Sequence, residues 1–122
     1  MILNLTDLSD EPLQGQISRQ IRAKILNGEL QAGESLPSIR GLSKDAKVSV
    51  ITVQRAYETL EHEELIHSRR GKGFFVSELK TSRKRTMAEQ RLIDGVIPLL
   101  DNALAEGLDK EEILQIIENQ LK

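Results

Sequence analysis

The side chains best suited to chemistry are basic ones, and they gather in two blocks of the chain. Residues 35–57 hold four basic groups and one acidic group, a net charge of +3. Residues 65–85 hold seven basic groups and one acidic group, a net charge of +6. Guanidinium and ammonium groups bind phosphate oxygens, so such blocks indicate a polyphosphate partner, above all nucleic acid. On charge alone, a solvated surface with clustered charges explains them equally well.

Other reactive side chains assemble no catalytic or metal site. The chain has no cysteine, and its two histidines, His62 and His67, lack a third ligand with suitable spacing. Neighbouring residues assemble no nucleophile–base pair, and pairs between residues distant in sequence stay open. The segment Gly71-Lys72-Gly73 lacks the long glycine loop and following helix of a phosphate-binding P-loop. We therefore predict no catalytic residues, no metal, no cofactor and no enzymatic activity.

Length and composition limit the class of protein. The 122 residues allow one ordinary domain or a small domain with an appendage, and 39% apolar residues supply a modest core. No apolar run approaches the roughly 18 residues of a membrane span, and residues 1–10 lack the basic start of an export signal. We expect a cytoplasmic protein with no membrane partner. The net charge of −2 argues at first sight against nucleic acid, but it sums the basic blocks with acidic segments at 58–64 and 86–122.

Apolar spacing predicts three helices in the first half of the chain. The first has an apolar residue at every fourth position, Leu13, Ile17, Ile21 and Ile25, and ends at Asn27-Gly28. Ser38 can cap a short second helix, and Ser49 can cap a third. Their apolar stripes are Ile39, Leu42 and Ala46 for the second, and Val53, Ala56, Tyr57 and Leu60 for the third.

A hairpin and two more helices are expected to follow. Extended runs flank the basic, glycine-containing segment Arg69–Gly73, which predicts a hairpin with a basic tip. Lys80–Thr86 has no core residue and is predicted to be a linker. Beyond it, Pro98 is expected to kink or split a broad amphipathic helix. Asp109 with Glu112 predicts the capping box of a last helix.

The order of these elements is that of a winged helix-turn-helix. In such a domain the third helix enters the major groove of DNA, the second helix braces it against phosphate, and the hairpin reaches the backbone or an adjacent groove. The predicted fold class is mainly α with a small β-hairpin. It comprises a winged helix-turn-helix DNA-binding domain at residues 10–78, a basic linker at 79–86 and a two-helix dimerisation tail at 87–122.

Several motifs resemble the GntR family of bacterial transcription regulators. They cover roughly residues 10–77 in register, and the remaining tail resembles the YtrA-type subfamily, whose two short helices replace the effector-binding domain of larger members. The matching segments are Pro12-Leu13, Gln16-Ile17, Ile25–Gly28, Ala32–Arg40, Val48-Ser49, Thr52-Val53, Arg55–Tyr57, Leu60-Glu61 and Arg70–Val76.

The resemblance implies DNA-contacting roles for matching positions. Arg40 would contact phosphate or a base, and Arg70 with Gly71 would form the wing contact. Val50 and Ile51 depart from the basic or amide residues of many members; they cannot hydrogen-bond a base edge but can pack against a thymine methyl. The predicted DNA-binding residues are Ser38, Arg40, Ser49, Val50, Ile51, Thr52, Gln54, Arg55, Arg70, Gly71 and Lys72. For Arg83-Lys84-Arg85, phosphate contact and a solvated linker remain equally open.

The tail predicts a homodimer. Its two amphipathic helices carry wide apolar faces that so small an appendage cannot bury, whereas a second copy would cover them. A twofold dimer also presents two recognition helices to a palindromic operator. The predicted dimerisation residues are Leu92, Ile93, Val96, Ile97, Leu100, Leu104, Ile113 and Ile117.

These observations favour a homodimeric transcription regulator, a repressor, that binds double-stranded operator DNA. The alternative is a winged-helix module that binds a protein through its third helix and hairpin, an interpretation that Val50 and Ile51 support. A small hydrolase lacks any recognisable constellation of residues. A small-molecule effector of unknown identity could bind between the tail and the DNA-binding domain.

Overall fold

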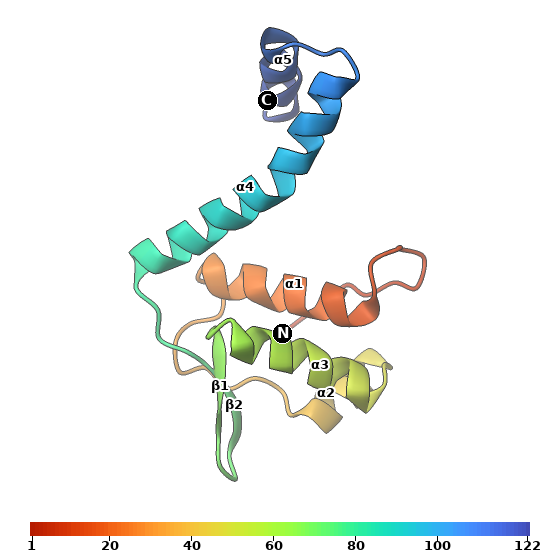
Figure 1. Cartoon of the computed structure of the whole chain (residues 1–122). Coiled ribbons are helices and arrows are strands. Elements are labelled where there is room, and N and C mark those ends of the chain that lie inside the picture. Colours follow the sequence, from red (N-terminus) through yellow and green to blue (C-terminus); the bar gives the residue numbers. More distant parts are fainter. The chain divides into compact units, whose positions relative to one another are not determined.

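Five helices and one β-hairpin follow one another along the chain (Figure 1). The structure, a computed structural model, describes residues 1–122. The predicted fold class, mainly α with a winged helix-turn-helix, is confirmed. The elements are α1 (Leu13–Leu26), α2 (Ile39–Ala46), α3 (Val50–His62), β1 (Ile66–Arg69), β2 (Gly73–Val76), α4 (Thr81–Ala105) and α5 (Lys110–Gln120).

The chain divides into two compact units, residues 1–84 and 85–122. In the first unit α3 is central, because it contacts α1, α2 and β1. Its predicted inward stripe is buried, and the stripe of α1 meets it: Ile17, Ile21 and Ile25 have no exposed surface. Burying one such side chain stabilises the fold by about 1.5–3 kcal/mol. The four-residue periodicity therefore identified the core of this unit correctly.

The two serines that begin α2 and α3 hold the helix-turn-helix in shape. Ser38 Oγ accepts a hydrogen bond from the Gly41 amide at 3.0 Å, and Ser49 Oγ accepts one from the Thr52 amide at 3.0 Å. Both predicted caps are confirmed. Gly41 leaves room for the first of them, because a Cβ at that position would lie 2.9 Å from Ser38 Oγ. Such caps contribute about 1 kcal/mol each and fix where the helices start.

The hairpin pairs β1 with β2 in antiparallel fashion, with Ile66 opposite Val76 and Arg69 opposite Gly73. The connector before α2 also pairs with β2. Ser35 forms an antiparallel bridge with Phe75, and the Leu36 amide donates to the Phe74 carbonyl at 2.9 Å. The strands therefore do not stand alone, which matters because an isolated two-stranded hairpin is marginal in water.

A buried ion pair joins α1 to the end of α3. The Arg22 guanidinium is almost fully buried and donates to both carboxylate oxygens of Glu63, at 2.8 and 3.1 Å. A cation in this position must be paired, since a lone buried charge costs several kcal/mol. Glu63 thus has a structural role within the acidic segment 58–64.

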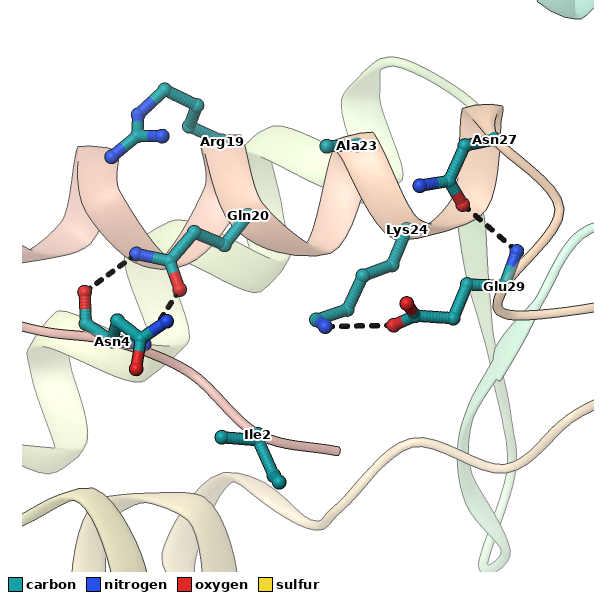
Figure 2. A pocket seen from close by; sticks show the side chains of 8 residues that line it. All are labelled: Ile2, Asn4, Arg19, Gln20, Ala23, Lys24, Asn27 and Glu29. Carbon is teal, nitrogen blue, oxygen red and sulfur yellow. Dashed lines mark hydrogen bonds and ion pairs between the residues drawn. The ribbon is translucent and has the colours of Figure 1, made fainter.

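The N-terminal segment lies along α1 and is held there by the side chains of Gln16 and Gln20, and Figure 2 shows the bonds of Gln20. The Gln20 carboxamide accepts from the Asn4 amide at 2.8 Å and donates to the Asn4 carbonyl at 2.7 Å. Gln16 makes the same pair of bonds with Thr6, at 3.0 and 2.8 Å. The two glutamines lie one helical turn apart, about 5.4 Å along α1. Asn4 and Thr6 lie two residues apart in an extended segment that rises about 3.3 Å per residue, so the two spacings match.

The tail helix α4 differs from its prediction in two respects. It begins at Thr81, so most of the segment 79–86 that was predicted as a linker is helical instead. That segment has no glycine or proline and is rich in helix-forming residues, so a solvated helix forms without an apolar face. The helix also continues through Pro98, which therefore does not split it. The capping box of α5 is confirmed: Asp109 Oδ1 accepts from the Glu112 amide at 2.9 Å.

Candidate nucleic-acid interface

The outer face of α3 carries most of the residues predicted to read DNA. Burial of the opposite stripe turns Ser49, Val50, Ile51, Gln54 and Arg55 toward solvent, and leaves Thr52 half-buried. Val50 is 44% exposed and Ile51 is 58% exposed. Both are large apolar residues, so the first turn of this helix presents an apolar surface.

The polar side chains at the start of α3 are already engaged within the chain. The hydroxyls of Ser49 and Thr52 bond each other at 2.7 Å between their oxygens, and the Ser49 oxygen also accepts from the Thr52 amide. Gln54 Nε2 donates to Glu58 Oε1 at 3.1 Å. These bonds shape the helix start and use part of the hydrogen-bonding capacity of its polar side chains.

The start of α2 presents a free cation. Arg40 is exposed and makes no ion pair, unlike Arg19, Arg22, Lys24 and Arg83, which pair with Glu11, Glu63, Glu29 and Glu64. The first amides of a helix have no intrahelical acceptor and attract anions. Ser38 is exposed as well, but its hydroxyl serves the cap. Arg40 and the helix start together suit a phosphate group.

The hairpin tip, residues 69–73, is the wing. Arg70, Gly71 and Lys72 are exposed, and the turn closes through the Lys72 amide, which donates to the Arg69 carbonyl at 2.9 Å. Gly71 has a φ of +74°, and nothing lies within 4 Å of where its Cβ would stand, so the chain there is open to close approach. The Arg69 guanidinium lies 4.6 Å from the centre of the Phe75 ring. This cation–π contact directs Arg69 along the wing, and Arg69 was absent from the predicted site.

One buried side chain ties the three parts of this surface together. The Tyr57 hydroxyl of α3 donates to the Pro37 carbonyl just before α2 at 2.7 Å. Its ring meets the Phe74 ring of β2 edge-on, with centres 5.0 Å apart. Burial raises the pKa of the Tyr57 hydroxyl above its ordinary value of about 10. Tyr57 is therefore a neutral core residue that positions α3 relative to α2 and the wing.

These parts lie on one side of the first unit. Figure 1 shows α2 and the hairpin tip on the side of α3 that faces away from α1. The cations Arg40, Arg55, Arg70 and Lys72 make no ion pair there. We call the start of α2, the first two turns of α3 and the wing the basic surface.

Other candidate sites are weaker. Of the Arg83-Lys84-Arg85 cluster, Arg83 pairs with Glu64 at 3.6 Å between Nη2 and Oε2. His67 Nδ1 lies 3.0 Å from Ser77 Oγ, and no group of three His, Asp or Glu side chains could hold a metal ion. None of the helices combines the length and the apolarity needed to cross a bilayer.

The tail exposes most of its predicted dimerisation residues. Leu92 is 67% and Ile97 is 48% exposed, while Ile113 is buried within the tail. Leu99, Leu114 and Ile116 are exposed too and were missing from the predicted set. An apolar pocket of about 230 Å³ is lined by both tail helices, with Leu100, Leu104, Lys110, Ile113, Leu114 and Ile117 around it.

Comparison with known proteins agrees with this geometry. The profile of a family described as bacterial regulatory proteins, gntR family, matches residues 13–76. The chain is 30% identical over 109 residues to the uncharacterized HTH-type transcriptional regulator YhcF of Bacillus subtilis, and the aligned region covers 88% of each protein. It is 32% identical over 91 residues to the HTH-type transcriptional repressor YtrA of the same organism, covering 75% of this chain and 68% of the repressor.

Solved structures extend the likeness to the fold. A GntR family transcriptional regulator from Listeria monocytogenes superposes with a TM-score of 0.74 at 28% identity, covering 94% of this chain and 98% of that one. The DNA-binding domain of AraR in complex with operator ORX1 has a TM-score of 0.54 at 27% identity, covering 62% of this chain and 93% of that one. The second likeness is to a domain that was solved in complex with operator DNA.

Proposed function

Because this chain belongs to the GntR family of bacterial regulatory proteins and is a transcription regulator with a DNA-binding domain, we propose that it binds a palindromic operator as a homodimer and represses transcription there. The domains would divide the work, with residues 10–78 binding DNA, 79–86 connecting and 87–122 dimerising. The protein would act in the cytoplasm. The repressor among its relatives supports repression as the outcome of binding.

The observation that carries this proposal is the set of unpaired cations around the exposed start of α3. The first two turns of α3 would enter the major groove, where base edges differ in their donors and acceptors. Arg40 and the start of α2 would hold a phosphate beside it, and Arg70, Gly71 and Lys72 would bring the wing to the backbone or an adjacent groove. Arg55 would contact phosphate or a base from the second turn of α3.

The acidic groups limit how the helix docks. Glu58 and Glu61 are exposed farther along α3, toward its C-terminal end. Like charges repel, so phosphates disfavour an approach by that half of the helix. The N-terminal half would therefore lead into the groove, as recognition helices commonly do.

The tail supports the dimer. Its exposed leucines and isoleucines form an apolar surface that two helices cannot cover by themselves, and twofold association of identical chains is the commonest solution. A small-molecule effector is compatible with this arrangement, and its identity is open.

Replacing Arg40 and Arg70 by alanine, singly and together, tests the DNA contacts. Affinity for duplexes selected from genomic fragments should fall, and the slope of log affinity against log salt should shrink by about 0.9 for each phosphate that the protein no longer neutralises. Lys122→Ala, which removes the same charge at the chain end, is the matched control and should change neither quantity. Unchanged affinity and slope in the double variant would exclude this surface as the DNA site.

A wild-type chain that binds no selected duplex but captures a protein through α3 and the wing would favour the interaction module instead. Val50 and Ile51 are the observation behind that second candidate, since exposed apolar residues also suit a protein partner.

A further inference from the structure

The apolar pair Val50 and Ile51 is the least expected feature of the exposed side of α3. Both residues are β-branched, which lowers helix propensity, and both lie outside the core. Neither the stability of the helix nor the packing of the unit therefore requires them. Their position calls for an explanation outside the folded chain.

Val50 and Ile51 are the first two residues of α3, so they would lead when the N-terminal end of this helix enters a DNA groove. Ile51 lies three residues before Gln54 and four before Arg55, so these side chains share one helical face. Side chains on a helix also lean toward its N-terminus. Val50 and Ile51 thus form the leading surface of the first turn, ahead of the polar residues.

The polar neighbours are partly engaged within the chain at this turn, although one hydroxyl hydrogen and the Gln54 carbonyl oxygen remain available. The Ser49 and Thr52 hydroxyls bond each other, and the Gln54 amide nitrogen donates to Glu58. The apolar group that the major groove itself offers is the C5-methyl of thymine, which no other standard base carries.

Charge identifies the occupant as DNA rather than an apolar protein face. Arg55 lies four residues after Ile51 on α3, Arg40 lies on the adjoining α2, and neither makes an ion pair within the chain. Free cations near an apolar pair suit DNA, in which phosphates lie near the base edges.

We propose that Val50 and Ile51 form a specificity element that selects thymine in the operator by packing against its methyl group. This proposal rests on the DNA-binding function proposed above and adds which base is read at this turn. Hydrogen bonding plays no part in the contact, so the element discriminates by the methyl alone.

Deoxyuridine tests the contact directly, because it removes the methyl and keeps the base pairing. Duplexes are selected from a random pool with the full-length protein, and the tightest is remade with deoxyuridine at each thymidine in turn. Burial of one methyl group predicts about a fourfold loss of affinity at the thymine in contact with the pair. Removing the equivalent methyl in both half-sites predicts about a fifteenfold loss if the two effects are independent.

The variants Val50→Ala and Ile51→Ala connect the methyl to the side chains. On the thymidine duplex, at least one of them should lose about as much affinity as deoxyuridine causes, and on the deoxyuridine duplex that variant should lose little more. The salt slope should stay that of the wild type, because every phosphate-binding side chain is still present. Leu8→Ala, which truncates an exposed apolar side chain in the N-terminal segment, is the control and should bind both duplexes like the wild type. Since all three positions are exposed and alanine favours a helix, the melting temperature should not fall.

Two results overturn the proposal in distinguishable ways. If the protein binds selected duplexes but no thymidine-to-deoxyuridine exchange weakens it, DNA binding stands and methyl recognition is wrong. If it binds no duplex at any salt concentration, DNA binding and methyl recognition fall together.

Discussion

Helices α1 and α4 are both amphipathic, yet one closes a core and the other leaves its apolar face open. In α1, Ile17, Ile21 and Ile25 are completely buried against α3. In α4, Ile93 and Ile97 also lie four residues apart, yet they are 37% and 48% exposed. Similar apolar patterns are thus buried in α1 and exposed in α4, because α1 has more neighbouring elements to pack against.

The first unit supplies those neighbours. There α3 meets α1, α2 and β1, and Tyr57 reaches from α3 to Pro37 and Phe74. The tail has only α4 and α5, which cover Ile113 and little else. We infer that the first unit keeps its shape through its own core, while the tail keeps its apolar faces for association.

The largest effect is expected from placing charge on the open face of α4. The double variant Ile93→Asp, Ile97→Asp should raise the dissociation constant of the proposed dimer by at least about a thousandfold, since four apolar side chains per dimer would become carboxylates. Sedimentation equilibrium measures the mass. The circular dichroism of the first unit's helices should persist.

Asn102→Asp is the matched control, because it adds charge to the polar side of the same helix and should leave the mass twofold. A wild-type protein that sediments as a stable monomer would refute the dimer, and a double variant that stays dimeric would move the interface elsewhere.

A pair of isoleucine truncations compares the two regions directly. Ile21→Ala opens a cavity in the buried core and should lower the free energy of unfolding by about 2–5 kcal/mol. Ile97→Ala removes an exposed side chain and should change the stability of the monomer by less than about 0.5 kcal/mol, while weakening self-association. Urea titrations at several protein concentrations separate the two effects. Equal losses for both variants would show that the tail is packed as tightly as the core.

The smallest effect concerns the residue that positions α3. Tyr57→Phe deletes the hydrogen bond to the Pro37 carbonyl and should lower the free energy of unfolding by about 1 kcal/mol. The raised pKa of Tyr57 adds a pH dependence. Above a pH of about 10 the unfolded chain loses this proton while the folded chain keeps it, so stability falls as pH rises through that range, by at most about 1.4 kcal/mol per pH unit.

Chemical denaturation between about pH 9 and about pH 11 measures this contribution. Subtracting the Tyr57→Phe curve from that of the wild type isolates it from the titration of lysines. Parallel curves for the two proteins would mean that the hydroxyl is hydrated rather than buried.

Local rules predicted much of this molecule. The serine caps of α2 and α3, the capping box of α5 and the buried stripes follow from residue types and spacings within one or two turns. The start of α4 escaped prediction because a solvated helix carries no apolar signal. Of the two outcomes predicted for Pro98, a kink or a split, the split is wrong, because α4 continues through this residue.

Contacts distant in sequence could not be read from the chain. Arg22 and Glu63 are 41 positions apart, and either looks like an ordinary surface charge until the fold brings them together. The same holds for Gln16 and Gln20, whose bonds to the N-terminal segment depend on where that segment lies. At the basic surface, residue types indicated the partner, but the internal bonds of Ser49, Thr52 and Gln54 became visible only in the folded chain.

One measurement tests whether the first unit binds DNA while the tail dimerises. It compares the affinities of the wild type and of the Ile93→Asp, Ile97→Asp variant for a duplex with one half-site and for a duplex with two. The wild type should prefer the two-site duplex by a factor of about 100 or more, because the second contact becomes intramolecular. The variant should bind one half-site as the wild-type monomer does and lose that preference. A variant that no longer binds a half-site, or that keeps the full preference, would contradict the account.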